Sequence, residues 1–371
     1  MKSLALVEAP DHVCCRYRIR AFEPSLIAAG GSLTIQGLDR GAIARMLQFR
    51  RATCFESVIL QRKLLPGWQF DELRRRSRRL IFDFDDAVLF RDSYDGRGPH
   101  CRKRAARFAR TVRGVDMVVA GNRFLADSAL RAGAVPERVH VIPTCVDTDG
   151  YRPATADSDG DGLDLIWIGS SSTVRGLERR KELWSRLAVE VPGIRLRLIC
   201  DRFPDLSPMP VVAIPWSEAT EAEALASGDV GISWVPDDLW SRGKCGLKVL
   251  QYQAAGLPVV ANPIGVHPEM IEPGVSGFLA TTADEWVEAI KVLAEDPVTR
   301  RRMGRAARAT VVSRYSVGAW ASVFLSAIGH TPRAHSPIIT VDEGGTDPAP
   351  RARRSDRPTT RTESETAPRR N

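Results

Sequence analysis

The sequence lacks several features that mark common protein classes. No apolar run approaches the ~20 residues that a membrane-spanning helix requires. The N-terminal run Met1–Val7 is broken at Glu8, and it is too short for the apolar core of a signal peptide. The seven cysteines form no Cys-x-x-Cys pair and have no nearby histidine that would complete a zinc site. We therefore expect a cytoplasmic protein with reduced, mostly buried thiols and no metal.

Sequence motifs for several kinds of chemistry are also missing. There is no Ser/His/Asp triad, no cluster of metal ligands and no Gly-x-x-x-x-Gly-Lys-Ser/Thr loop. Positive charge is concentrated in residues 1–150, which hold nine more Lys/Arg than Asp/Glu, with clusters at 74–79 and 102–110. Since no DNA- or RNA-binding motif accompanies this charge, we do not expect nucleic acid as a partner. A solvated helix face, anionic lipid or a phosphorylated acceptor would each account for it.

Apolar segments alternate with helical segments along residues 1–330. Expected strands are Ser3–Val7, Leu33–Gly37, Ser57–Leu60, Leu80–Phe84, Asp116–Ala120, Val139–Pro143, Leu163–Ile168, Arg195–Cys200, Val211–Pro215 and Asp229–Val235. Expected helices are Ile19–Ala29, Trp68–Arg78, Arg102–Arg113, Asn122–Ala132, Gly176–Val189, Glu218–Ala226, His267–Ile271, Ala283–Ala294, Pro297–Arg314 and Val317–Ile328, with a hairpin-like segment at Gly274–Ala280. Continuous apolar strands separated by helices predict an α/β fold with parallel sheets covered on both faces.

The alternation is interrupted once, and this divides the chain. Residues 143–162 are rich in turn formers and acidic, as an interdomain connection would be. We expect two doubly wound domains, at 1–150 and 151–316, and a helix at 317–330 that packs back across them. The tail 331–371 has almost no large apolar side chains and is expected to be disordered.

A loop, a helix and a buried strand follow one another within residues 240–262. Gly243 and Gly246 flank the expected helix start, and Leu247 and Leu250 fall on one face. The free N–H groups at such a start, with the positive end of the helix dipole, favour a bound phosphate. An ordinary structural unit of a parallel sheet is the competing interpretation.

The same region carries a family resemblance. Residues 248–271 contain Ala-Ala-Gly-x-Pro-Val-Val-Ala and then Gly-x-x-Pro-Glu, and residues 274–279 read Gly-x-x-Gly-Phe-Leu. Residues 166–176 add a strand and a glycine loop that ends in Arg-Gly. These motifs, in this order, resemble the retaining glycosyltransferases of family 4, which have the GT-B fold. Motifs at 15–19, 82–86, 121–125 and 143–147 resemble a bacterial branch of that family.

The resemblance implies two Rossmann-like domains that face each other across a crevice. It implies transfer of a sugar from a UDP-sugar or GDP-sugar to a hydroxyl acceptor with retention of configuration, generally without a metal or other cofactor. On matched positions, the groups expected to hold or stabilise the nucleotide diphosphate are Arg175, Lys248, Gly169, Ser170, Gly246, Leu247, Gln251 and Glu269. The expected partners are the nucleotide sugar, a glycan or lipid-linked acceptor and, through the basic N-terminal domain, the anionic inner face of the membrane.

Two positions depart from the family pattern. The family has two glutamates separated by seven residues around this helix. In this sequence the corresponding positions are occupied by Gly243 and Gln251. Glutamine still bonds ribose hydroxyls, but loss of the first glutamate removes a usual contact to the donor sugar. A catalytically inactive nucleotide-binding or scaffold protein is therefore one alternative, and a nucleotide-sugar epimerase of similar fold is another.

Polar residues in the first half are candidates for the acceptor side. Asp85 and Asp86 follow a buried strand, where active-site groups of open α/β sheets collect, and we expect catalytic roles for them. Arg16 and Arg18 follow the first strand, and Asn122 follows another. For each of these residues a structural role competes: helix capping for Asn122 and the aspartates, and solvent exposure for the arginines.

Overall fold

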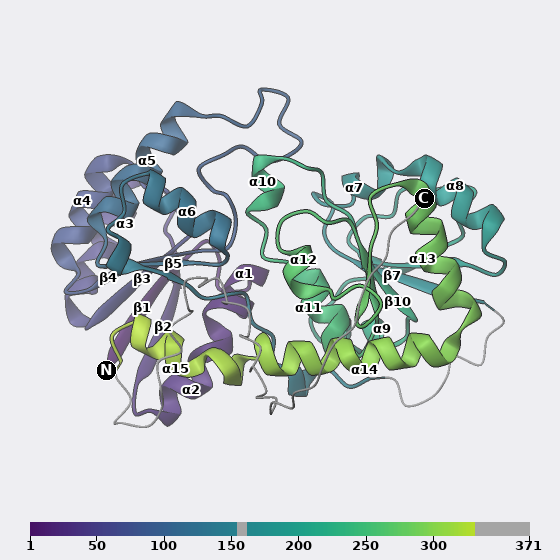
Figure 1. The fold of residues 1–371 in the computed structure, drawn as a ribbon. Helices are drawn as coiled ribbons and strands as arrows, with labels where there is room; N and C mark the ends of the chain where they lie inside the picture. Colours follow the sequence, from purple (N-terminus) through teal and green to yellow (C-terminus); the bar gives the residue numbers. More distant parts are fainter. Residues whose placement is uncertain (154–161, 331–371) are drawn as a thin grey trace, which may run out of the picture. The chain divides into compact units, whose positions relative to one another are not determined.

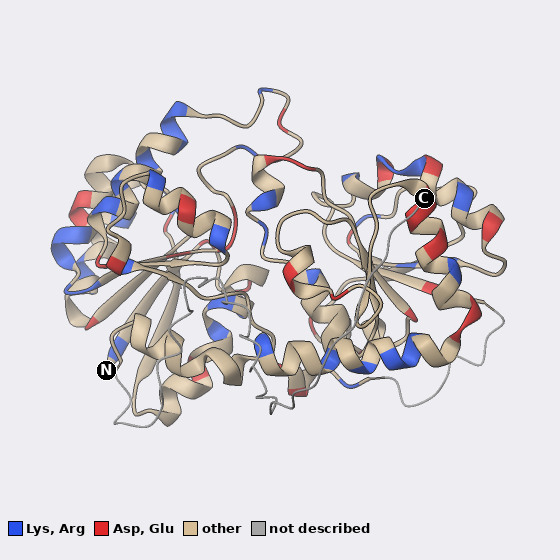
Figure 2. Cartoon of the chain, viewed as in Figure 1, with Lys and Arg blue, Asp and Glu red and all other residues tan. Residues whose placement is uncertain are grey.

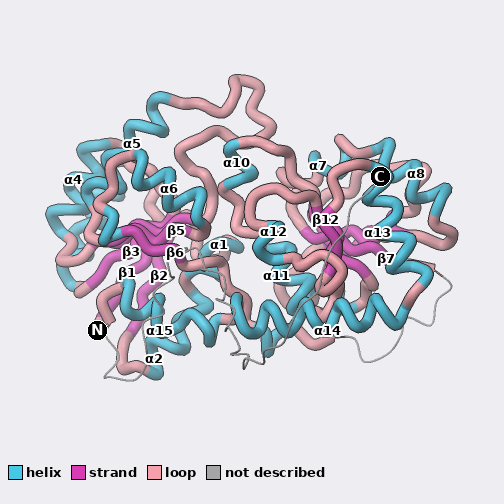
Figure 3. The backbone as a smooth tube through the Cα atoms, in the orientation of Figure 1, coloured by secondary structure: helices cyan, strands magenta, loops and turns pink. Residues whose placement is uncertain are grey.

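The N-terminal part of the chain forms a sheet of six parallel strands (Figure 1, Figure 3). The computed structural model describes residues 1–153 and 162–330. The strands of this first sheet are β1 (Lys2–Val7), β2 (Ser32–Gly37), β3 (Ser57–Gln61), β4 (Leu80–Phe84), β5 (Met117–Ala120) and β6 (Val139–Val141). They lie in the order β2-β1-β3-β4-β5-β6. All side chains of β3 and β4 are buried, as expected for strands covered on both faces.

Helices cover both faces of the first sheet. One face carries α3 (Ala42–Arg50), α4 (Gly67–Arg76), α5 (Arg102–Gly114) and α6 (Arg123–Arg131), and the other carries α1 (Val13–Arg18), α2 (Glu23–Ala28) and α15 (Val317–Ala327). Short 3-10 turns are η1 (Arg20–Phe22), η2 (Arg51–Cys54), η3 (Pro136–Arg138) and η4 (Thr148–Gly150). The ring of Phe324 in α15 stacks on Phe22, with centroids 4.2 Å apart. The last described helix is thus held on the sheet formed by the first strands.

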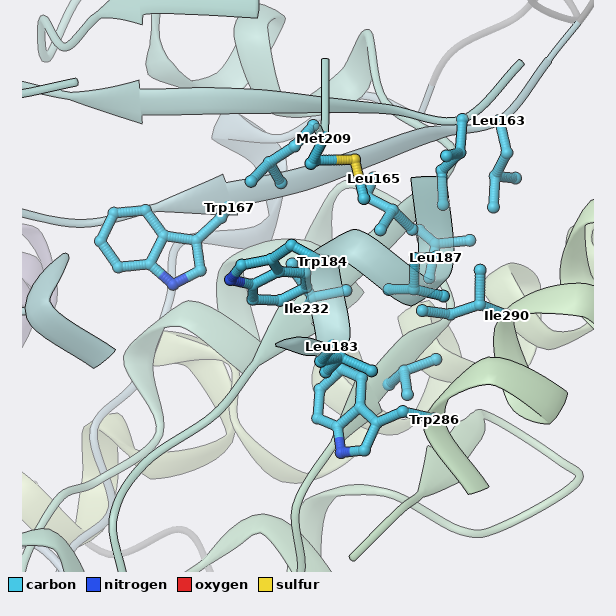
Figure 4. Close-up of a cluster of buried hydrophobic side chains, with 14 of the residues drawn as sticks. Leu163, Leu165, Trp167, Leu183, Trp184, Leu187, Met209, Ile232, Trp286 and Ile290 are labelled. Atoms are coloured by element: carbon cyan, nitrogen blue, oxygen red, sulfur yellow. The ribbon is translucent and has the colours of Figure 1, made fainter. Parts of the chain in front are cut away.

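A second sheet of six parallel strands follows. Its strands are β7 (Asp164–Ile168), β8 (Arg195–Cys200), β9 (Val211–Pro215), β10 (Val230–Ser233), β11 (Val259–Ala261) and β12 (Gly277–Leu279), in the order β12-β11-β10-β7-β8-β9. Its helices are α7 (Arg175–Glu178), α8 (Lys181–Glu190), α9 (Glu221–Ala226), α10 (Leu239–Arg242), α11 (Leu247–Ala254), α12 (His267–Met270), α13 (Ala283–Glu295) and α14 (Pro297–Arg314). Three buried indoles, Trp167, Trp184 and Trp286, fill the core between this sheet, α8 and α13 (Figure 4).

Local signals explain several helix boundaries in this half. Thr282 and Glu285 form a capping box at the start of α13, which satisfies backbone donors that the helix leaves free. Asp296 accepts from the N–H of Thr299, and Pro297 occupies the first position of α14, where a missing N–H is harmless. Within the described residues, none of the helices is both long and apolar enough to cross a membrane.

The two parallel sheets with their covering helices confirm the predicted fold class. The prediction of one helix over 19–29 was wrong, because α1 ends at Arg18 and α2 begins at Glu23, with Pro24 in its first turn. The segment expected to be hairpin-like forms β12, which pairs parallel to β11. The expected disordered tail, and residues 154–161 of the expected connection, lie outside the described residues.

Candidate active site

The second sheet has a topological switch point between β7 and β10. From β7 the chain continues to β8 on one side, whereas β10 leads to β11 on the other, so the loops that leave their carboxyl ends diverge. Asn262 fixes the loop after β10, since its Oδ1 accepts from the N–H of Val235 at 3.0 Å and its Nδ2 donates to the carbonyl of Val235 at 2.7 Å. Ligands of open α/β sheets bind at such a point.

The side chain of Lys248 reaches this point from α11. Its Nζ donates to Thr173 Oγ1 at 3.2 Å and lies 3.6 Å from the ring centroid of Trp167. A Cβ on Gly169 would lie 2.5 Å from this Nζ and 2.3 Å from the ring of Trp167, so a larger residue here would displace the amine or the indole. Burial, together with the neighbouring Lys244, holds the pKa of Lys248 well below its usual value. Within residues 1–153 and 162–330, Lys248 forms no ion pair.

The predicted nucleotide-side residues Gly246 and Leu247 lie at the start of α11, and Ser170 and Arg175 follow β7. Gly246 adopts a left-handed conformation, with φ of 65°, at the start of α11, and no side chain caps the helix that begins at Leu247. The N–H of Ser170 donates to Thr173 Oγ1 at 3.2 Å. Arg175 is exposed at the start of α7, two residues after Thr173. It too forms no ion pair with a described residue, so two cations without a carboxylate flank the loop 169–173.

A segment of the first half reaches these cations. The loop between β4 and α5 carries Tyr94, whose ring lies 5.8 Å from the guanidinium carbon of Arg175 and 4.7 Å from that of Arg179. The preceding Ser93 donates to Asp238 Oδ1 at 3.1 Å. The sequence carries no local signal for these contacts, because they join residues more than 80 positions apart.

The two predicted catalytic aspartates meet two cations at the end of β4. Arg62 pairs with Asp86, and its Nε lies 3.5 Å from Oδ1 of Asp85. Lys244, from the segment before α11, lies 3.5 Å from Asp86 Oδ1. Oδ1 of Asp85 is buried and accepts no hydrogen bond from the described residues, and burial raises the pKa of Asp85 against the opposing effect of Arg62. The aspartates are therefore held by cations from both halves of the chain.

Arg62 is a site residue that the sequence predictions did not include. Its φ of 59° makes it the one described non-glycine residue with a positive φ. Such backbone conformations are unfavourable and concentrate at functional sites. The available signal was its place directly after the buried strand β3, at the same sheet edge as Asp85 and Asp86.

Asn122 and Glu269, predicted for opposite sides of the crevice, line one cavity of about 390 Å³. Its other lining residues are Arg123, Phe124, Asp237, Arg242, Pro263, Ile264, Gly265 and Val266. Asn122 is also the N-cap of α6, because its Oδ1 accepts from the N–H of Leu125 at 2.9 Å, and its Nδ2 donates to the carbonyl of Lys244 at 3.1 Å. The side chain of Asn122 thus caps α6 and also lines the cavity.

The two predicted acceptor-side arginines are already paired. Arg18 is 2% exposed, and its guanidinium donates to Asp83 Oδ1 at 2.6 Å and to the carbonyl of Ile142 at 2.5 Å. Its charge is satisfied inside the first sheet, and we assign Arg18 a structural role in place of an acceptor contact. Arg16 is one-quarter exposed and pairs with Glu221 at 2.6 Å.

Gln251 lies in a buried network, away from the loop at Lys248. Its Nε2 donates to the hydroxyls of Tyr17 and Tyr151 at 3.1 and 3.2 Å, and both hydroxyls lie within 3.2 Å of Glu221 Oε1. Burial raises the pKa of Tyr17 and brings that of Tyr151 to about 12, so both hydroxyls stay protonated and donate to the carboxylate. In this position glutamine suits a network that already contains one carboxylate.

Gln251→Glu is expected to destabilise the protein, because it would place a second buried carboxylate one hydroxyl away from Glu221. We expect the free energy of unfolding to fall by roughly 1–3 kcal/mol, the cost of a buried polar group without a partner. Urea denaturation measures this change. The double variant Gln251→Glu/Glu221→Gln should regain most of the loss, and a single variant as stable as the wild type would contradict the assignment.

Part of the chain is similar in sequence to known glycosyltransferases. The profile of the family described as glycosyl transferase-like matches residues 179–326. A D-inositol 3-phosphate glycosyltransferase from Kribbella flavida is 28% identical over 244 residues, which cover 54% of this chain and 54% of that protein. The chain thus spans about half the length of the curated relatives it matches.

Solved structures share the fold over most of the chain. Anabaena Alr3699/HepE in complex with UDP and glucose has a TM-score of 0.64 at 16% identity, covering 88% of this chain and 98% of that one. A glycosyltransferase from Rickettsia africae ESF-5 has a TM-score of 0.68 at 14% identity, covering 89% and 99%. At such identities the likeness establishes the fold alone. Residues 179–326 thus resemble the glycosyl transferase-like family in sequence, and the two-sheet fold resembles that of glycosyltransferases of known structure.

Proposed function

We propose that this chain transfers a sugar from a UDP-sugar or GDP-sugar to a hydroxyl acceptor, with retention of anomeric configuration. The observation that carries the proposal is the pair of cations, Lys248 and Arg175, which flank the loop 169–173 without a carboxylate partner in the described residues. Unpaired cations beside a helix N-terminus favour a diphosphate. The complex of Anabaena Alr3699/HepE with UDP and glucose supports a uridine nucleotide as donor.

In this proposal the chemistry is electrostatic. As the bond from the sugar to the diphosphate breaks, negative charge develops on the leaving oxygens, and preorganised donors lower the barrier. Lys248, Arg175 and the N–H groups at Gly246 and Leu247 would supply those donors with no metal or other cofactor. Arg18 has no part in this scheme, because its guanidinium is committed to buried partners. The Nε2 of Gln251 is likewise committed to Tyr17 and Tyr151.

The acceptor would enter from the side of the first sheet. Asp85 and Asp86 would orient its hydroxyl group, which attacks the sugar from the face that the diphosphate leaves. We accordingly assign acceptor binding to residues 1–150 and donor binding to 151–316, with 317–330 joining the two. The acceptor would be a glycan, a lipid-linked saccharide or a small metabolite, and the inositol phosphate relative favours a phosphorylated hydroxyl compound. The basic N-terminal half would contact anionic lipid.

Thermal unfolding in the presence of nucleotides tests this function. We expect UDP or GDP to raise the free energy of unfolding by about 2.7 kcal/mol when the free nucleotide is a hundredfold above its Kd. Arg175→Ala should lose most of this shift because it removes a diphosphate cation. Arg186→Ala is the matched control, because this arginine of α8 pairs with Glu190 of the same helix and with Asp284 of α13. This variant should keep the shift.

The outcomes separate the alternatives. A nucleotide shift followed by sugar transfer to an added acceptor supports the proposal. A shift without sugar release across a panel of donors would identify an inactive nucleotide-binding protein, and conversion of the donor without any acceptor would identify an epimerase. If no nucleoside diphosphate changes thermal unfolding, the assignment of the site is wrong.

A further inference from the structure

Three large apolar side chains of α3 and α4 are exposed to solvent. Ile43 is 80% exposed, Leu47 is 55% exposed and Trp68 is 54% exposed. Ile43 and Leu47 are one turn apart on α3 and therefore share a face. Helix α4 packs beside α3, where Nη1 of Arg45 donates at 3.2 Å to Oε1 of Gln69, the residue after Trp68. We call Ile43, Leu47 and Trp68 the apolar trio.

The neighbouring helix α5 is strongly basic. It carries six Lys/Arg and no acidic residue, and Figure 2 shows Lys and Arg gathered on α4 and α5. Arg102, Lys103 and Arg104 occupy its first turn, where the helix dipole disfavours cations. Arg102 and Lys103 are exposed and form no ion pair with any described residue. Their position therefore weakens the helix and leaves both charges open to an external anion.

The carboxylates on these helices pair with cations other than Arg102 and Lys103. Asp71 on α4 pairs with Arg110, and Glu72 pairs with Arg75 and Arg76. Helices α3 and α5 contribute no carboxylate of their own. The surface thus combines protruding apolar side chains with unneutralised positive charge.

We propose that α3, α4 and α5 form a docking surface for a membrane that contains anionic phospholipid. Indole and aliphatic side chains of the apolar trio would enter the boundary between headgroups and acyl chains, while Arg102 and Lys103 attract the lipid phosphates. Charge complementarity selects this occupant over a protein, because α5, which packs against α4, carries the unpaired Arg102 and Lys103. The inference extends the lipid contact within the proposed function, but binding to vesicles does not depend on sugar transfer.

Sedimentation of the full chain with vesicles tests the proposal. The probes are vesicles of phosphatidylcholine alone and of phosphatidylcholine with about one-third phosphatidylglycerol, which supplies the anionic surface. We expect binding to the anionic vesicles only, with weakening as salt is added. The triple variant Ile43→Ser/Leu47→Ser/Trp68→Ser should bind at least about tenfold more weakly, given the apolar area that it removes. Arg102→Gln/Lys103→Gln should weaken binding to the anionic vesicles about 25-fold, at about fivefold for each charge.

A matched control keeps the test specific. Ile27 is an apolar residue, 59% exposed, on α2 at the opposite face of the first sheet, and Ile27→Ser should bind as the wild type does. Equal binding of the triple variant and this control would overturn the proposal, as would equal binding to neutral vesicles or no binding at all. All these variants should keep the UDP-dependent thermal shift, so a failure of membrane docking is distinguishable from a failure of the nucleotide site.

Discussion

Lys248→Ala is expected to lower kcat/KM for sugar transfer by about 10²–10³-fold, the effect of removing one preorganised donor to a developing anion. The amine points at the loop 169–173, where it lies over the ring of Trp167, and it has no carboxylate partner in the described residues. Steady-state kinetics with saturating acceptor measures the change. Full activity in the variant would remove Lys248 from the diphosphate site.

Lys248→Met separates the charge of this residue from its packing. Methionine keeps an unbranched chain against Trp167 but carries no charge. We therefore expect Lys248→Met to be as impaired in transfer as Lys248→Ala while unfolding at the same urea concentration as the wild type, or higher. A Met variant that lost stability in proportion to activity would indicate a purely structural role.

The lowered pKa of Lys248 gives this site a pH dependence with a definite sign. Diphosphate binding requires the ammonium, so UDP affinity should fall as the pH rises through the lowered pKa. The stability of the protein without nucleotide should instead rise with pH. Between that pKa and the unfolded value of about 10.4, the unfolded chain binds more protons, and the free energy of unfolding therefore rises with pH. Both trends should disappear in Lys248→Met, which calorimetric titration and urea denaturation can verify.

Asp83→Ala is expected to destabilise the protein by about 3–5 kcal/mol, because it leaves the guanidinium of Arg18 buried without its counter-charge. Asp83 is 1% exposed and Arg18 is 2% exposed, so water cannot replace the lost partner. Urea denaturation at neutral pH measures the loss.

Replacing both members of this pair provides the control. The double variant Arg18→Met/Asp83→Leu removes the buried charges together and should regain most of the stability. It should also keep the UDP-dependent thermal shift, because neither residue lies at the nucleotide loop. If the double variant were stable but inactive towards the acceptor, the acceptor role first predicted for Arg18 would be restored.

The sequence determined the layout of the protein because the signals for it are local. Uninterrupted apolar strands such as β3 and β4 must be covered on both faces, and this requirement led directly to parallel sheets with helices on either side. The placement of Gly246, Leu247 and Lys248 at a helix start followed from the glycine and the apolar spacing after it. The structure confirms that helix start, while its role in binding a phosphate stays a prediction.

Only the tertiary structure decided which charges are free, because each decision depends on a partner distant in the chain. Arg18 and Lys248 are both cations near a loop, yet Arg18 finds Asp83 and Lys248 finds no carboxylate among the described residues. Gln251 stands where the family resemblance predicts glutamate, and its contacts with Tyr17 and Tyr151 make it part of a buried network. The net charge and the spacing of residues can be read from the sequence, whereas the desolvation of a charge and its pairing with another depend on neighbours in three dimensions.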